Sequence, residues 1–421
     1  MSNNTRLAIL VAALGYFVDV YDLILFSILR VPSLTDLGVP QDQLLAQGSY
    51  LLNMQMGGFL IGGVVWGVIG DKVGRIQLLF GSILLYSIGN ILNGFVGQMG
   101  DIGGLSVINQ YASMRLISGF GLAGEIGGGI TLVSELLPKE SRVFGTTIVV
   151  ATGVAGAVVA AMVYKYFDWR SAYIAGGVLG LLLLILRMSV AESGLFKTLA
   201  EKAHVSRGNF LMLFNNWERF LRYLNSIMIG LPIWYSLGIV VTFSPEITKA
   251  IGLAEPVTGV DSVFWFYCGI TIGSVANGLL SQLLRSRKLA IGLFLIGTVA
   301  TLALVFHSGI KTADQFYTLV FALGFGTAYW AMFVTVAAEQ FGTNLRATVA
   351  TSVPNFVRGA TVPMVALFNL LKPSQGVANS AEIVALAAAA LAFFALGMLR
   401  ETFGLDLDFV ESDAQTAKQK A

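Results

Sequence analysis

The amino-acid sequence predicts an all-α membrane protein with twelve transmembrane helices in two pseudo-symmetric bundles of six. Composition is the first reason, because 56% of the 421 residues are hydrophobic and only 12% are charged, whereas a soluble domain carries about 25% charged residues. The second reason is that stretches of roughly 20 residues almost free of charge recur along the chain, the length that spans a bilayer as a helix. The third is a polar interruption near the middle, which divides these stretches into two equal sets.

Hydropathy sets the expected limits of the twelve spans, which lie at 7–30, 49–69, 77–98, 105–133, 143–164, 171–190, 220–244, 262–284, 289–307, 315–338, 345–371 and 380–399. The longest polar stretch, 191–219, is expected to be a cytoplasmic linker. It separates an N-terminal six-helix bundle, 1–190, from a C-terminal six-helix bundle, 220–400. Residues 401–421 are expected to form a cytoplasmic tail.

Basic residues predict the orientation in the membrane. Loops on the side of the N-terminus hold three times as many lysines and arginines as loops on the other side. Cytoplasmic loops carry such an excess, so both termini are expected in the cytoplasm. In this count Arg187 belongs to the cytoplasmic side and Arg30 to the outer side, while Arg115 and Arg358 fall inside spans. The short loops favour the inner membrane of a bacterium.

The two halves repeat one another at their cytoplasmic loops. The basic loop "GVIGDKVGRIQ" follows the second span, and the basic loop "GLLSQLLRSRK" follows the eighth. After the fourth and tenth spans an acidic residue precedes an arginine by seven positions, in "ELLPKESR" and "EQFGTNLR". These pairs, Glu135 with Arg142 and Glu339 with Arg346, are expected to act as gates. Two repeated halves with a polar interior are typical of a secondary transporter, whose site lies between the halves.

The loop after the second span resembles the signature that the major facilitator superfamily carries at this place. Its pattern, G-x-x-x-D-x-x-G-R, is matched by Gly67, Asp71, Gly74 and Arg75. The second basic residue that often follows is replaced by Ile76 here. The resemblance covers essentially the whole chain and implies the fold of that family, with alternating access to a central site. Asp71 and Arg75 would then pair with a neighbouring helix end when the cytoplasmic side is closed; the alternative is a basic loop that only sets topology.

Three further segments resemble one branch of that family, which includes metabolite:proton, phosphate:proton and aromatic-acid:proton symporters. They are "RLISGFGLAGEIGGGITLVSELLPKESR" (115–142), "DWRSAYIAGGVLG" (168–180) and "YFVDVYDLILFSI" (16–28). In these families the second aspartate of the first span and the arginine that begins the span-4 motif are linked to proton coupling. The resemblance therefore implies that role for Asp22 and Arg115. Glu125 occupies a place at which phosphate symporters carry a functional carboxylate.

Charged side chains inside the spans provide a separate argument, because each costs at least about 2.5 kcal/mol in hydrocarbon unless it faces a cavity or a partner. At a rise of about 1.5 Å per residue, Asp19 and Glu125 lie level near the midplane, and Asp22 and Arg115 lie further out. The hypothesis is that Asp22 pairs with Arg115 until a proton breaks the pair. Asp19 and Glu125, if close, do not both ionise readily, so one of them would carry a proton. The alternative is a static ion pair that positions the first and fourth spans.

Arg358 is the intramembrane charge of the second half, and no acidic residue of spans 7–12 is an obvious partner. A permanently charged guanidinium in this setting needs an anion. A carboxylate or phosphate of the substrate would serve, and the alternative is a salt bridge to Asp19, Asp22 or Glu125 across the halves. Residues expected either to line the cavity or to pack inside the bundles are Tyr16, Asn53, Gln55, Asn225, Trp234, Tyr235, Asn277, Tyr329, Trp330 and Asn355. The aromatic members would suit a substrate with an apolar body.

Several classes of function are disfavoured by what the sequence lacks. A net charge of +2 argues against nucleic acid. The two histidines and one cysteine lie too far apart for a metal-ligand cluster,. No G-x-x-x-x-G-K-[ST] loop occurs, so ATP is not expected to drive the protein. No cofactor is expected, and no nucleophile or metal set points to a membrane enzyme.

The expected function is proton-coupled symport of a small organic anion, a carboxylate, by a monomer in the lipid bilayer. Inorganic phosphate:proton symport and proton-independent facilitation of a sugar or other small metabolite stay open. A receptor or a channel fits less well, because a pore has no need of two matching cytoplasmic gates.

Overall fold

The computed structural model of the protein describes residues 3–73, 75–100, 103–125, 139–192, 210–404 and 409–411. These residues form helices and connecting turns, and they include no β-strand. Within them, seven stretches are long and apolar enough to cross a membrane, judged by length and composition. The last of these stretches, 343–398, covers two of the expected spans.

The first six expected spans correspond to α1 Asn3–Asp36, α2 Leu44–Val73, α3 Arg75–Gly94, α4 Val107–Leu122, α6 Lys139–Tyr166 and α7 Trp169–Glu192, with the short 3-10 helix η1 Gln41–Gln43 before α2. Helix α1 packs on α6 and α7, α2 packs on α4, and α3 packs on α4 and α7. Gly119 of α4 lies against the backbone of Gln55 in α2, where a Cβ would overlap it. Small residues at such crossings let transmembrane helices approach closely.

The last six expected spans correspond to α9 Trp217–Tyr235 with the π-helix η3 Ser236–Val241, α11 Gly259–Leu284, α12 Arg287–His307, α13 Ala313–Thr327 with α14 Trp330–Glu339, and α15 Thr343–Gly359 with α16 Thr361–Met398. The short helices η2 Phe210–Leu213 and α10 Ser244–Ala250 connect them. The N-termini of several of these helices are capped by side chains. Thr312 and Gln315 form a capping box at α13, and Ser286 accepts the backbone N–H of Leu289 at α12,.

The eleventh expected span is interrupted between α15 and α16. Pro363 has no N–H to donate to the carbonyl of Gly359, so a continuous helix would lose that bond. Further along α16, Gly376 adopts φ 75° and ψ 173°, a conformation that glycine tolerates,. This bend separates the eleventh expected span from the twelfth.

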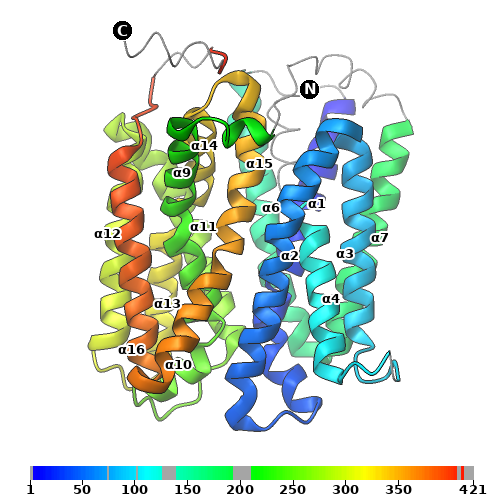
Figure 1. Ribbon diagram of the computed structural model, residues 1–421, viewed down its shortest axis with the longest axis vertical. Coiled ribbons are helices and arrows are strands. Elements are labelled where there is room, and N and C mark those ends of the chain that lie inside the picture. The colour runs from blue at the N-terminus through cyan, green and yellow to red at the C-terminus, as the bar shows by residue number, and fades with distance from the viewer. Residues whose placement is uncertain are drawn as a thin grey trace.

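The two sets of helices lie side by side, with α1–α7 forming one bundle and α9–α16 the other (Figure 1). Helix α1 begins and α16 ends at the same end of the molecule, hereafter the terminal end (Figure 1). Between the bundles, α2 contacts α15 and α16, while α11 contacts α1 and α6.

An ion pair joins the bundles at the end opposite the terminal end. Arg30 of α1 is fully buried, and its two terminal nitrogens each lie 2.6 Å from a carboxylate oxygen of Glu246 in α10. The Arg30 guanidinium also stacks over Phe243 at 5.0 Å, and Ser27 and Thr242 share a hydroxyl hydrogen bond of 2.8 Å. Arg30 was counted above among outer loop residues; the structure places it inside an inter-bundle contact, which we call the distal clasp (Ser27, Arg30, Thr242, Glu246).

Parts of the expected linker and tail pack on the C-terminal bundle. Phe210, from the linker, is buried, and its ring stacks on Phe356 of α15 with centroids 6.2 Å apart. Glu411, from the tail, accepts two hydrogen bonds from Arg222 at 3.0 and 3.2 Å. The backbone N–H of Thr343 donates to the carbonyl of Phe409 at 2.7 Å. The described ends of both segments are therefore fastened to the terminal ends of α9 and α15.

Candidate substrate and proton site

Arg358 lies at the end of α15, between the two bundles, and only 3% of it is exposed. Its guanidinium carbon lies 5.1 Å from the ring centre of Trp330, 5.2 Å from that of Trp234 and 5.4 Å from that of Phe59. Phe59 belongs to α2 and the two tryptophans to the other bundle, so both halves contribute. Arg358 Nε and Nη1 have no hydrogen-bond partner within the described residues. The alternative given above, a salt bridge to Asp19, Asp22 or Glu125, is not formed among the described residues, and the guanidinium lies against ring faces,.

Two tyrosines and an aspartate complete the surroundings of Arg358. Tyr16 and Asp19 on α1 and Tyr267 on α11 all interact electrostatically with its guanidinium. We call these residues, with the three rings, the arginine chamber (Tyr16, Asp19, Phe59, Trp234, Tyr267, Trp330, Arg358). Phe59 and Tyr267 were not predicted, because nothing in a single sequence distinguishes them from the many other aromatic residues in spans.

Glu125 follows the end of α4 and forms an ion pair with Arg187 of α7. Both are buried, with 1% of Glu125 and 5% of Arg187 exposed. Arg187 was counted on the cytoplasmic side, and the structure adds that it lies within α7 with its guanidinium buried against Glu125. Hydropathy locates the end of a span but not the direction in which a long side chain reaches, and Arg187 extends inward to the carboxylate. Asp19 interacts electrostatically with both members of this pair, as its predicted depth indicated.

Asp22 and Arg115 are both fully buried and interact electrostatically, but they do not form a direct ion pair. Neither oxygen of Asp22 and none of the guanidinium nitrogens of Arg115 has a hydrogen-bond partner among the residues that the structure describes. Arg115 instead lies between the rings of Phe26 and Tyr173, 5.3 Å from each centre. The positions of Asp22 and Arg115 along their helices predicted that the two residues lie at the same depth in the membrane. Depth alone does not determine how far apart their charged groups lie across the bundle, and the Arg115 guanidinium lies between two rings.

Five of the remaining predicted lining residues divide into three groups. Trp234 and Trp330 belong to the arginine chamber. Tyr235 and Tyr329 donate their hydroxyls to backbone carbonyls inside the C-terminal bundle, at 2.6 and 3.0 Å, and so serve packing. Asn355 donates to the carbonyl of Ala123 at 2.8 Å and links α15 to the end of α4.

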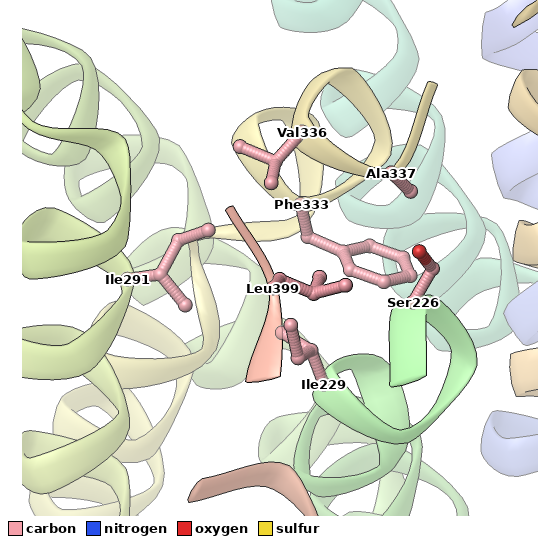
Figure 2. Close-up of a pocket in the computed structure, with 7 residues that line it drawn as sticks. All are labelled: Ser226, Ile229, Ile291, Phe333, Val336, Ala337 and Leu399. Carbon is pink, nitrogen blue, oxygen red and sulfur yellow. The ribbon is translucent and has the colours of Figure 1, made fainter. Parts of the chain in front are cut away.

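The cavities outside the chamber are small or distant. One of about 230 Å³ lies between α11 and α14 and is lined in part by Asn277, Ser281 and Arg287. A second, shown in Figure 2, is an apolar gap where Ile229 and Phe333 gather round Leu399, and it is too small to admit water. Arg358 lines neither of them.

The predicted gate residues are partly described. Glu135 and the side chains of Asp71, Arg75 and Arg142 lie outside the described residues. Glu339 forms its ion pair with Arg287, the first residue of α12, and not with Arg346 seven positions later. Arg287 belongs to the basic loop after the eighth span, so the acidic end of α14 contacts the counterpart of the signature loop.

Comparison with known proteins gives a consistent result. The family model described as Major Facilitator Superfamily matches residues 12–362. The chain is 26% identical over 418 residues to the "Probable 4-methylmuconolactone transporter" of Cupriavidus pinatubonensis, covering 96% of this chain and 92% of that protein. It is 28% identical over 214 residues to the sialic acid transporter of Escherichia coli, covering 50% of this chain and 49% of that protein.

Among solved structures, that of a D-xylose-proton symporter superposes with a TM-score of 0.66, covering 95% of this chain and 99% of the other. The two sequences are 16% identical, so this likeness concerns the fold alone. The family model, in contrast, extends over most of the sequence, from the first span to the end of the Arg358 segment. The chain therefore belongs to the major facilitator superfamily, whose members here are transporters of small molecules and not enzymes.

Proposed function

We propose that the protein is a proton-coupled symporter of a small organic carboxylate with an apolar body. The observation that carries the proposal is the arginine chamber, in which Arg358 lies against three rings and its Nε and Nη1 have no hydrogen-bond partner among the described residues. A buried guanidinium of this kind binds a carboxylate in fixed geometry. The surrounding rings supply apolar area for the rest of the substrate.

The named relatives support the carboxylate, since sialic acid and 4-methylmuconolactone both carry one. Inorganic phosphate, the first alternative, has no apolar body to use the three rings. A proton-independent facilitator would have no use for the buried carboxylates of Asp19 and Asp22 beside the chamber. The proposal further places a monomer in the cell inner membrane, with the terminal end in the cytoplasm, as the basic loops predict.

A thermal-shift screen tests the proposal. Purified protein is melted with carboxylates, phosphate, sugars and amines at pH 6 and pH 8, because a ligand that binds the folded state raises the melting temperature as it saturates. We expect carboxylates with an aromatic or aliphatic body to stabilise the protein most. Arg358→Ala should remove the shift, and Arg358→Lys, which keeps the charge, should retain only part of it. A shift produced by sugars or cations alone would contradict the proposal.

A further inference from the structure

Four charged side chains, one each from α1, α7, α15 and the segment after α4, are linked by one ion pair and by electrostatic interactions with Asp19. Asp19 interacts with Glu125, with Arg187 and with Arg358. Two are carboxylates and two are guanidiniums, so the group is electrically balanced when both carboxylates are ionised. Net charge inside a membrane protein is costly in free energy. The ions that bind in the chamber should therefore together add no net charge.

Helix α1 helps to fix the position of the Arg187 side chain. Gly15 of α1 lies directly against the Arg187 guanidinium, and a Cβ on residue 15 would overlap it and lie 3.4 Å from Glu125 Oε1. Asp19 follows Gly15 by one helical turn on the same face of α1. Three helices thus converge on the pair, and one oxygen of Glu125, one of Asp19 and Nη1 of Arg187 have no hydrogen-bond partner among the described residues.

The other groups near the cluster are either tyrosines or charged residues that interact with a residue of opposite charge. Tyr86 of α3 is fully buried and interacts with both aspartates, Glu125 and Arg187. Asp22 is matched by Arg115, with which it interacts. The charged and titratable groups that face the cluster are therefore Tyr16, Asp22, Tyr86, Arg115 and Tyr267.

We propose that Arg187 is a positioning residue of the coupling site, which neutralises Glu125 so that Asp19 is the carboxylate left for the proton and Arg358 is the cation left for the substrate. The empty chamber is balanced, and it stays balanced when one proton binds Asp19 and one monovalent carboxylate binds Arg358. Either one alone leaves an uncompensated charge. The expected stoichiometry is therefore one proton for each monovalent anion. This inference rests on the proposed function for the nature of the substrate, but not for the role of the pair.

Removal of Arg187 should act on substrate binding from a distance. In Arg187→Gln, Glu125 loses its partner, and Arg358 is the remaining guanidinium that interacts with the cluster. Arg358 would then serve the carboxylates and bind the substrate anion more weakly. At lower pH a proton on Glu125 would restore the balance.

The test compares Arg187→Gln, Arg187→Lys and the double variant Glu125→Gln/Arg187→Gln with the unmodified protein. Binding of the carboxylate found in the screen is measured at pH 6 and pH 8. We expect Arg187→Gln to bind at least tenfold more weakly at pH 8 and to lose less at pH 6. The double variant, which removes both charges, should recover to within about threefold, and Arg187→Lys should be intermediate. A static bridge between α4 and α7 would lower the melting temperature of Arg187→Gln and leave the binding and its pH profile unchanged, which would overturn the inference.

Two further measurements separate the possible failures. Gly15→Ala displaces the guanidinium without changing any charge and should weaken binding in the same direction, whereas Gly57→Ala, which meets open space, should not. This pair also decides the matter if Arg187→Gln does not fold. If no carboxylate binds the unmodified protein, the proposed function fails. The Glu125–Arg187 pair can then still be tested by the melting temperatures of the variants without ligand. In that case the melting-temperature deficit of Arg187→Gln must shrink between pH 8 and pH 6 and be smaller in the double variant; an equal deficit in all conditions counts against the inference.

Discussion

Three of the five buried arginines of the described residues have three different kinds of surroundings. Arg30 has a carboxylate on both terminal nitrogens. Arg115 has two ring faces and a carboxylate at longer range. Arg358 has three ring faces and, of the groups described, no hydrogen-bonded anion on Nε or Nη1. Because desolvation of a guanidinium is repaid fully only by an anion, Arg358 is the one best placed to bind a substrate.

The two aspartates of α1 differ in the same respect, and their amide variants should separate their roles. Asp19 interacts with Glu125, Arg187 and Arg358, whereas the cation that interacts with Asp22 is Arg115, which ring contacts hold in place. We expect Asp19→Asn to abolish uptake driven by a pH gradient while substrate exchange across the membrane continues. Asp22→Asn should reduce driven uptake by less. Both are measured in proteoliposomes, and the opposite order, with Asp22→Asn uncoupled and Asp19→Asn driven normally, would assign the proton to Asp22.

At the scale of elements, helix ends at the terminal end of the C-terminal bundle are fastened by carboxylates from other segments. Glu339 of α14 pairs with Arg287 of α12, and Glu411 joins Arg222 of α9 to Asn344 at the start of α15. Glu401 accepts the hydroxyl of Ser286 and the backbone N–H groups of Arg287 and Lys288 at the start of α12. The Glu401 contacts satisfy backbone N–H groups that have no partner within α12, and they place a negative charge at the positive end of that helix dipole,.

The pH dependence of stability should reveal the Glu401 cap. Burial works against its charge, but hydrogen bonds from Ser286 and from the backbone of Phe403, Arg287 and Lys288 prevail and lower the pKa of Glu401 from 4.5 to about 2. The cap therefore stabilises the folded protein fully above about pH 4.5, and this contribution is lost as the pH falls toward 2. Glu401→Gln should cost about 1 kcal/mol at pH 7, because it weakens the cap of one helix at a partly exposed site,.

The measurement is a melting curve of the detergent-solubilised protein at a series of pH values. The difference between Glu401→Gln and the unmodified protein should narrow below pH 4.5. A difference that is constant between pH 7 and pH 3 would mean that the charge of Glu401 contributes nothing.

At the scale of the whole molecule, the distal clasp joins the bundles at one end, and the chamber lies between them. Alternating access requires that each end open in turn, so the clasp must break when the distal end opens. Arg30 is fully buried, and a buried ion pair that loses one partner destabilises the arrangement that holds the other,.

Glu246→Gln should therefore favour the state that is open at the distal end. The measurement is the rate at which a bulky thiol reagent modifies Ser27→Cys in a Cys268→Ser background, since Ser27 is buried in the clasp. We expect the rate to rise several-fold in Glu246→Gln. Asp36→Asn is the matched control, because it removes a pair with Arg170 inside the N-terminal bundle. Equal rates in Glu246→Gln and the control would mean that the clasp does not hold this end closed.

Much of this architecture was predictable from the sequence. Hydropathy located each expected span on a helix or helix pair of the described structure, and the signature loop pointed to the family that the comparison then established. The intramembrane charges Asp19, Asp22, Arg115, Glu125 and Arg358 were also visible, because ionisable residues are rare in apolar stretches. Their roles in coupling and binding stay predictions.

The partners of those charges were decided by tertiary structure alone. Arg187 pairs with Glu125, Arg30 with Glu246 and Glu339 with Arg287, and none of these pairs was expected. Composition and spacing along a helix determine the depth of a residue in the membrane and the face it occupies. Which residues meet at that depth depends on how helices distant in the sequence pack side by side. Glycines such as Gly15 leave the space for these contacts, because a Cβ at that position would overlap the Arg187 guanidinium.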